Sequence, residues 1–147
     1  MFNKFFLLCC FALLSLTGCS GNVQLSGKVT FSDDGSPLTC GRVCFLADDL
    51  QAFGDLKADG TFVVGTSSPN DGLPLGSYKV FITGAVRTVE SVERTQKLGD
   101  ETLKIVDEVT ESLIDKKFTS PSTSGLTLEV TPSTRHYPIR VERYKRI

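Results

Sequence analysis

The chain has 147 residues, of which 40% are hydrophobic, and its formal net charge at pH 7 is −1. A chain of this length supports one domain of ordinary size with a single hydrophobic core. The balanced charge excludes a partner held by overall electrostatic attraction, so we expect no binding of nucleic acid.

The first 18 residues predict a secretory signal peptide that forms a short signal helix. Lys4 precedes an almost wholly apolar run at residues 5–16, and export signals show this order of a charged start and an apolar segment. A helix that spans a bilayer needs about 20 apolar residues, so this run is too short for a permanent anchor. Small residues then precede Cys19 in the sequence Leu16-Thr17-Gly18-Cys19.

This tetrapeptide resembles the lipobox of bacterial lipoproteins at all four positions. The resemblance implies a diacylglycerol on the Cys19 thiol, cleavage between Gly18 and Cys19, and acylation of the new amino terminus. Each buried methylene contributes about 0.8 kcal/mol, so two or three acyl chains hold a protein stably on a membrane. We expect residues 19–22 to form a short tether, which keeps the protein at a membrane of the bacterial cell envelope. The alternative is an ordinary cleaved signal with an unrelated cysteine nearby.

Two of the five cysteines, Cys40 and Cys44, remain once the signal peptide and the lipid site are set aside. A remaining pair in an exported protein could form a disulfide. In one extended strand, however, their Cα atoms would lie about 13 Å apart, and bridging needs about 7 Å or less. We expect unpaired cysteines, since a disulfide would require a turn or bulge at Gly41.

The first part of the mature chain predicts short strands separated by turns. Residues 23–31 alternate between apolar and polar side chains, which is typical of a half-buried strand. A dense turn signal at residues 33–37 follows, and residues 42–46 predict a second strand. Asp59-Gly60 lies between extended stretches at 51–57 and 61–64, and this pair predicts a β-hairpin with a type I′ turn.

The later strands show the same alternation. Residues 65–76 are rich in Ser, Pro, Asn, Asp and Gly and predict a loop. Strands are expected at residues 78–83, 126–131 and 137–142, with Phe81 as the one large apolar group on an outward face. About seven short strands without strand–helix alternation predict an all-β fold, an antiparallel β-sandwich.

A long charged excursion at residues 86–124 interrupts this pattern. Its apolar residues Leu103, Val106, Val109 and Leu113 have spacings of three, three and four, which fit one face of a short amphipathic helix. Residues 104–106 could equally join a strand. We expect an excursion with at most one short helix and with mobile charged ends.

Four separated motifs stand out in the mature chain, at residues 25–31, 34–38, 59–62 and 76–80. Together they resemble the carboxypeptidase regulatory-like domain, a transthyretin-like (prealbumin-like) sandwich of seven strands. A later set of residues resembles small lipoproteins of planctomycete-type bacteria that carry this domain: Phe118, Ser120-Pro121, residues 123–127 and Glu129-Val130. The resemblance implies one sandwich domain over residues 23–147 that serves as an accessory binding or folding module and lacks the peptidase active site. Fold alone assigns no activity.

Motifs for catalysis are missing from the sequence. His136 is the single histidine, and there is no Gly-x-Ser-x-Gly elbow, His-Glu-x-x-His motif or phosphate-binding Gly-rich loop. A Ser–His triad would have to use His136, which lies at a strand entrance where a solvated histidine is the commoner interpretation. We therefore expect no enzymatic activity and no cofactor.

Turn carboxylates are the candidates for a metal site. Asp34, Asp48 and Asp59 could offer the oxygen ligands that calcium prefers if they met at one end of the sandwich. Aspartate also favours turns for local hydrogen-bonding reasons, and this simpler interpretation needs no metal.

The C-terminal stretch is basic and offers candidates for contact with an anionic surface. The residues are Arg140, Arg143, Lys145 and Arg146. Basic side chains near anionic lipid headgroups gain about 1 kcal/mol each, and polyanionic wall polymers offer similar charges. The alternative is a polar strand face followed by a frayed basic tail.

Two functions remain open from the sequence. In the first, the protein is a non-catalytic binding or accessory module of the cell envelope, with residues 65–76 and 86–124 available to a protein or polysaccharide partner. In the second, it is a structural envelope component whose outward sheet edges associate with copies of itself. Carbohydrate binding is disfavoured because the chain has no Trp and offers only Phe53, Phe81 and Phe118 as stacking platforms.

Overall fold

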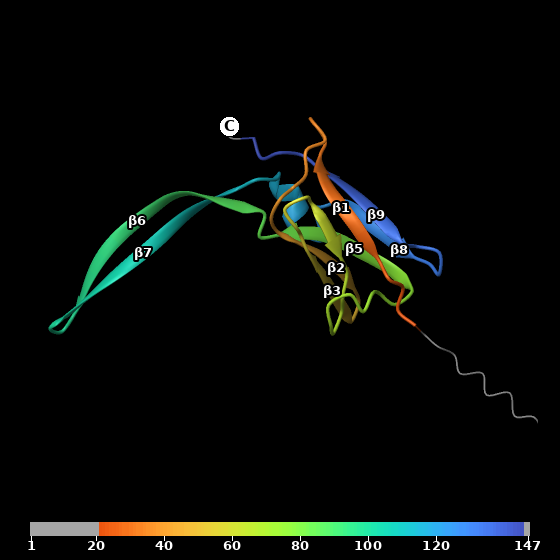
Figure 1. Cartoon of the computed structure of the whole chain (residues 1–147), viewed down its shortest axis with the longest axis horizontal. Helices are drawn as coiled ribbons and strands as arrows, with labels where there is room; N and C mark the ends of the chain where they lie inside the picture. Colours follow the sequence, from red (N-terminus) through yellow and green to blue (C-terminus); the bar gives the residue numbers. More distant parts are fainter. Residues whose placement is uncertain (1–20, 146–147) are drawn as a thin grey trace, which may run out of the picture.

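The computed structural model describes residues 21–145, and this part of the chain is almost entirely strand and loop (Figure 1). The described strands are β1 (Ser26–Phe31), β2 (Arg42–Ala47), β3 (Leu50–Asp55), β4 (Thr61–Val63), β5 (Gly76–Thr83), β6 (Val86–Leu98), β7 (Glu101–Ser112), β8 (Leu126–Val130) and β9 (His136–Val141). One 3₁₀ helix, η1, covers Lys116–Thr119. The prediction of an all-β fold is confirmed.

Seven of these strands form two sheets that pack on one core, and we call this part the sandwich body. One sheet has the order β4-β1-β9 and the other has the order β3-β2-β5-β8. Phe45 of β2 joins the two sheets, because its ring centre lies 6.2 Å from that of Phe62 in β4 and 6.4 Å from that of Tyr137 in β9. Phe45 and Phe62 are fully buried, so the core lies between the sheets.

The pairing of β1 with β9 is parallel, from Ser26 opposite His136 to Phe31 opposite Val141. The expectation of a wholly antiparallel sandwich is therefore wrong at this pair. Side chains alternate with the same period of two in parallel and antiparallel strands, so the sequence pattern does not record the direction of a neighbour.

The alternation in β1 predicts its buried face well. Leu25, Val29 and Phe31 are buried, and Gly27 lies between them on the same face. A Cβ atom on Gly27 would lie 2.3 Å from the Phe62 ring and 2.2 Å from the carbonyl oxygen of Tyr137. The Phe62 ring thus fills the space that a side chain at position 27 would occupy.

The turn at Asp59-Gly60 joins two sheets instead of closing a two-stranded hairpin. Gly60 has φ of +78°, and its N–H donates to the carbonyl oxygen of Lys57 at 2.8 Å. Beyond the turn, β3 and β4 belong to different sheets, and Phe53 of β3 bridges instead to Gly65, two residues after β4. The type I′ prediction is wrong, because that turn needs positive φ at both central residues and Asn70 is the one described non-glycine residue with positive φ.

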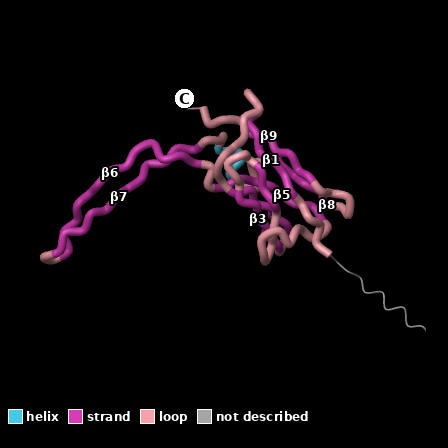
Figure 2. The backbone as a smooth tube through the Cα atoms, in the orientation of Figure 1, coloured by secondary structure: helices cyan, strands magenta, loops and turns pink. Residues whose placement is uncertain are grey.

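The excursion contains a long two-stranded antiparallel sheet that projects from the sandwich body (Figures 1 and 2). We call β6 and β7, residues 86–112, the arm. The helix expected over residues 103–113 is wrong, and the strand alternative for residues 104–106 is confirmed. Strand alternation explains the misleading spacing, since it puts Leu103 and Val109 on one face and Val106 on the other. Within the described part of the excursion, η1 is the helical segment.

Candidate functional site

The arm has two chemically different faces. Directly opposed residues of an antiparallel pair share a face, and the register opposes Leu103 to Gln96 and Val109 to Glu90. One face, which we call the apolar face, consequently holds five apolar side chains that are each at least 37% exposed. They are Val92, Leu98, Leu103, Ile105 and Val109. Val106 is the one large apolar residue of β7 on the opposite face.

Ion pairs between the two strands support the register of the arm. Arg87 bonds Glu111 at 2.8 Å, and Arg94 pairs with Asp107. Exposed pairs of this kind contribute only about 0.2–1 kcal/mol each. All 13 residues of β6 are exposed, and an isolated two-stranded sheet is marginally stable in water. The arm therefore lacks the buried surface that normally holds strands of this length in place.

Backbone hydrogen bonds and buried side chains attach the arm to one end of the sandwich body. We call this attachment, formed by Ala85 before β6 and residues 113–118 after β7, the root of the arm. The Leu113 N–H donates to the carbonyl oxygen of Ala85 at 2.9 Å, and the Asp115 N–H donates to that of Glu142 at the same distance. Ile114 is fully buried and Phe118 of η1 is buried to 6% exposure. These contacts close the end of the core beside the arm.

Sequence reasoning missed the arm, although one local signal could have found it. Gly99-Asp100 separates β6 from β7 as a two-residue loop, and Gly99 has φ of +64°. Gly-Asp between two runs rich in Val and Thr is a hairpin signal.

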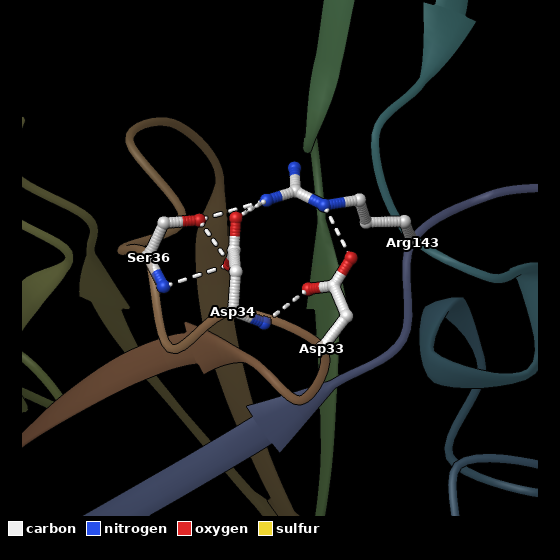
Figure 3. A network of polar contacts seen from close by, with 4 residues as sticks. All are labelled: Asp33, Asp34, Ser36 and Arg143. Atoms are coloured by element: carbon white, nitrogen blue, oxygen red, sulfur yellow. Dashed lines mark hydrogen bonds and ion pairs between the residues drawn. The ribbon is translucent and has the colours of Figure 1, made fainter.

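Three side chains, those of Asp33, Asp34 and Ser36, surround the Arg143 guanidinium, and we call the four residues the Arg143 cluster (Figure 3). Arg143 donates from Nε to Asp33 at 2.9 Å and from one terminal nitrogen to Asp34 and to Ser36 at 2.8 Å. Hydrogen bonds from the hydroxyl and the N–H of Ser36, together with Arg143, lower the pKa of Asp34 to about 2. The guanidinium also lies 3.7 Å from the centre of the Phe31 ring.

This cluster changes the prediction for the basic C-terminal residues. Arg143 is paired with two carboxylates of its own chain, so it is not a free cation for an anionic surface. Arg140 and Lys145 are exposed, and neither side chain has a hydrogen-bond or ion-pair partner among residues 21–145. Arg146 lies outside the described residues.

The three candidate calcium ligands do not come together. Asp34 belongs to the Arg143 cluster, and Asp59 accepts from the N–H and hydroxyl of Thr61 at 3.0 and 2.6 Å. Asp48 is exposed in the turn between β2 and β3. Between residues 21 and 145, no group of three His, Cys, Asp or Glu side chains is arranged to hold a metal ion. Local turn hydrogen bonds explain Asp34 and Asp59.

Asp71 organises the loop at residues 65–76. It accepts hydrogen bonds from the N–H groups of Thr66, Ser67 and Ser68 and from the Thr66 hydroxyl. These bonds, with the one from the Thr66 N–H as the largest cause, lower the pKa of Asp71 to about 2. The loop is thereby held in one conformation, so it is a less adaptable contact surface than its composition predicts.

The two remaining cysteines are not joined to each other. Cys40 is half-buried, with its thiol 3.5 Å from the carbonyl oxygen of Val86. Cys44 is buried in β2 beside the Thr83 hydroxyl at 3.7 Å. Burial raises the pKa of the Cys44 thiol, so it is a poor nucleophile.

The structure places the histidine considered for catalysis on the surface, and it buries two of the three aromatic residues considered for sugar stacking. His136 is exposed as the first residue of β9. Phe81 and Phe118 are buried, at 9% and 6% exposure. Phe81 lies, as predicted, on the face of β5 opposite to the core residues Val80 and Ile82, but that face is covered at this position. Phe53 is half-buried below the Arg42 guanidinium, 5.3 Å from the ring centre. Buried rings cannot act as stacking platforms, which leaves Phe53 alone among the three.

The predicted signal peptide and Cys19 lie outside the described residues. Over residues 21–145, the structure contains no helix that is both long and apolar enough to span a membrane. No protein-family model, curated protein or solved structure matches this chain.

Proposed function

We propose that this protein is a non-catalytic lipoprotein, held at the bacterial cell envelope through Cys19, and that the arm is its interaction element. One observation carries the proposal: the first described residues and the root of the arm lie at opposite ends of the sandwich body (Figure 1). Val23 bridges to Leu73 at one end, and Ile114 bridges to Arg143 at the other. An anchor at Cys19 would leave the root of the arm at the end remote from the membrane.

The surface near the N-terminal end suits a position beside a membrane. Val23, Pro74, Leu75 and Pro132 line a shallow hollow there, and the Leu75 side chain is 57% exposed. Cys19 is only four residues from Val23 in the sequence, so a lipid on its thiol would hold this hollow close to the headgroups. An exposed apolar side chain gains free energy at the boundary between headgroups and acyl chains.

We further propose that the sandwich body is a transthyretin-like sandwich of the carboxypeptidase regulatory-like type, used as an accessory module. The three-stranded and four-stranded sheets around one core support this fold. The non-catalytic role is supported by His136, whose exposed side chain has no hydrogen-bond partner among the described residues. Purified protein should hydrolyse ester and peptide substrates no faster than buffer, and turnover that His136→Ala abolishes would contradict this role.

Membrane fractionation tests the anchor. The wild-type protein should sediment with membranes and enter detergent, whereas Cys19→Ala should appear in the soluble exported fraction. Cys40→Ala is the matched control, because it removes a half-buried thiol from the sandwich body and should leave membrane retention unchanged. Retention of Cys19→Ala in the membrane fraction would refute the anchor.

The second candidate function is that of a self-associating structural component of the envelope. The apolar face of the arm favours it, since five exposed apolar side chains gather on one surface. Both edges of the two-stranded sheet also lack a further strand within the described structure.

A further inference from the structure

We propose that β7 pairs with β7 of a second copy of this chain, in antiparallel orientation, so that two arms form one four-stranded sheet. The inference rests on the proposed role of the arm as the interaction element and names its partner. It concerns an edge of the arm whose N–H and C=O groups have no strand beside them in the described structure.

The two edges of the arm are not equivalent. Natural proteins protect open edges with bulges, proline and lysine. Neither strand contains proline, and each has one lysine, Lys97 in β6 and Lys104 in β7. The difference is that β6 has a register shift between Thr88 and Glu90, with one extra residue, whereas β7 runs over its 12 residues without one. The β7 edge is therefore the better template for another strand.

Symmetry restricts how two β7 strands can pair. In a two-fold arrangement, residue i opposes residue j and residue j opposes residue i. Opposed residues share a face, and the two members of a pair either both direct their backbone groups toward the partner strand or both direct them away, so i and j are both odd or both even. The register centred on Val106 meets this condition and overlaps residues 101–111, nearly the whole of β7.

Charges favour the register centred on Val106. In it, Lys104 opposes Glu108 of the second copy, and symmetry repeats this pair. Registers centred on Lys104, Asp107 or Glu108 would each place two like charges on the symmetry axis, and directly opposed like charges are destabilising. The register centred on Ile105 forms no pair of opposite charges.

Apolar contacts agree with the same register. Leu103 opposes Val109 of the second copy, again twice, and both residues belong to the apolar face. Val106 opposes its own copy on the other face. Two like-charge pairs, Glu101 opposite Glu111, lie near the ends of the overlap, where Arg87 already pairs with Glu111. Ile105 opposes Asp107 of the second copy, so charged side chains interrupt the apolar face. The combined sheet has four strands, and sheets of three or more strands with a hydrophobic face are stable where a lone hairpin is marginal.

The corresponding arrangement of β6 is less favourable. Centring β6 on its middle residue, Val92, opposes Glu90 to Arg94 but also Arg87 to Lys97, so charges do not favour it, and it runs across the bulge between Thr88 and Glu90. The broken ladder therefore opposes the β6 arrangement.

Cysteine crosslinking of the full-length protein in its own membrane tests the pairing. Val106→Cys should form a dimer of twice the chain mass under mild oxidation, and a reductant should remove it. Val106 is 55% exposed, so the substitution does not disturb the core. Two controls should not crosslink: Thr95→Cys, which lies on β6, and Lys104→Cys, because its two copies would lie about 13 Å apart and disulfides need about 7 Å or less.

The result that overturns the inference is equally specific. Crosslinking of Val92→Cys, at the centre of the β6 arrangement, in place of Val106→Cys would assign the contact to β6. Failure of Val106→Cys to crosslink above the wild-type background would exclude pairing of β7 in this register. Either result would refute the self-pairing proposal. The separate proposal of a lipid-anchored module would still stand, provided that membrane retention still depended on Cys19.

Charge exchange in the Val106→Cys background provides a second measurement. Lys104→Glu or Glu108→Lys alone creates two like-charge pairs and should reduce association by about tenfold. The double variant Lys104→Glu/Glu108→Lys restores both pairs and should crosslink as well as the parent. Lys97→Glu makes the same charge change on β6 and should leave the crosslink unchanged. A double variant no better than the single variants would contradict the register.

Discussion

Arg143 and Asp34 are separated by 109 positions in the sequence, yet a guanidinium nitrogen of one donates a 2.8 Å hydrogen bond to the carboxylate of the other. Asp33 accepts a second bond from the same guanidinium. The contact holds the segment after β9 against the turn that follows β1, at the end of the sandwich body where the arm is rooted (Figures 1 and 3).

Removal of this guanidinium should destabilise the fold. We expect Arg143→Ala to lower the free energy of unfolding, since it loses two exposed ion pairs and a cation–π contact with Phe31. Arg140→Ala is the control, because Arg140 is exposed without a partner in the described structure, and it should change stability by less than about 0.5 kcal/mol. Urea titration measures both, and equal losses in the two variants would contradict the structural role of Arg143.

The arm should be dispensable for the stability of the sandwich body. Arg87 and Glu111 oppose each other, so replacing residues 88–110 by Asn-Gly gives a short hairpin between them. The thermal midpoint should stay within about 4 °C of the wild type, equivalent to roughly 1 kcal/mol or less. In contrast, Ile114→Ala at the fully buried root should cost about 2–5 kcal/mol. A large loss on removal of the arm would show that β6 and β7 support the core.

Acid should weaken the loop that Asp71 organises. Its pKa is about 2 in the folded protein, against a usual value of 3.8, so its stabilising effect is complete above about pH 4 and is lost as the pH falls toward 2. Asp71→Asn should therefore be less stable than the wild type at pH 5, and the difference should shrink at pH 2.5. Chemical denaturation at the two pH values measures this.

Asp48→Asn is the matched control for Asp71→Asn, because the Asp48 carboxylate accepts no hydrogen bond within residues 21–145. Its effect on stability should be small at both pH values. A stability difference for Asp71→Asn that is the same at pH 5 and pH 2.5 would contradict the role of the ionised carboxylate.

The two cysteines of the sandwich body should differ in reactivity. Cys40 is half-buried, whereas Cys44 is buried and has a raised pKa. Iodoacetamide should therefore modify Cys40 in the native protein and Cys44 only after denaturation. Peptide mass mapping measures each rate, and a peptide pair joined by a Cys40–Cys44 disulfide would contradict the structure.

The candidate site was only partly predictable from the sequence. Residues 86–124 are recognisable in the sequence as an unusual charged segment. The spacing of Leu103, Val106 and Val109 predicts a helix, however, whereas all three residues lie in strand β7. The exposure of the apolar face could not be read from the sequence, because an apolar strand residue is normally buried and only the tertiary structure shows that no residue within 21–145 covers this face.

The sequence by itself determined the all-β class, since the alternation of Leu25, Val29 and Phe31 records which face of a strand is buried. It also contains the tetrapeptide ending at Cys19, on which the anchoring proposal rests. Tertiary structure alone decided that β9 runs parallel to β1, that the Phe62 ring fills the space beside Gly27, and that Arg143 is neutralised by its own chain. The physical reason is that periodicity is a local property, whereas strand partners, strand direction and ion pairs depend on contacts between residues far apart in the chain.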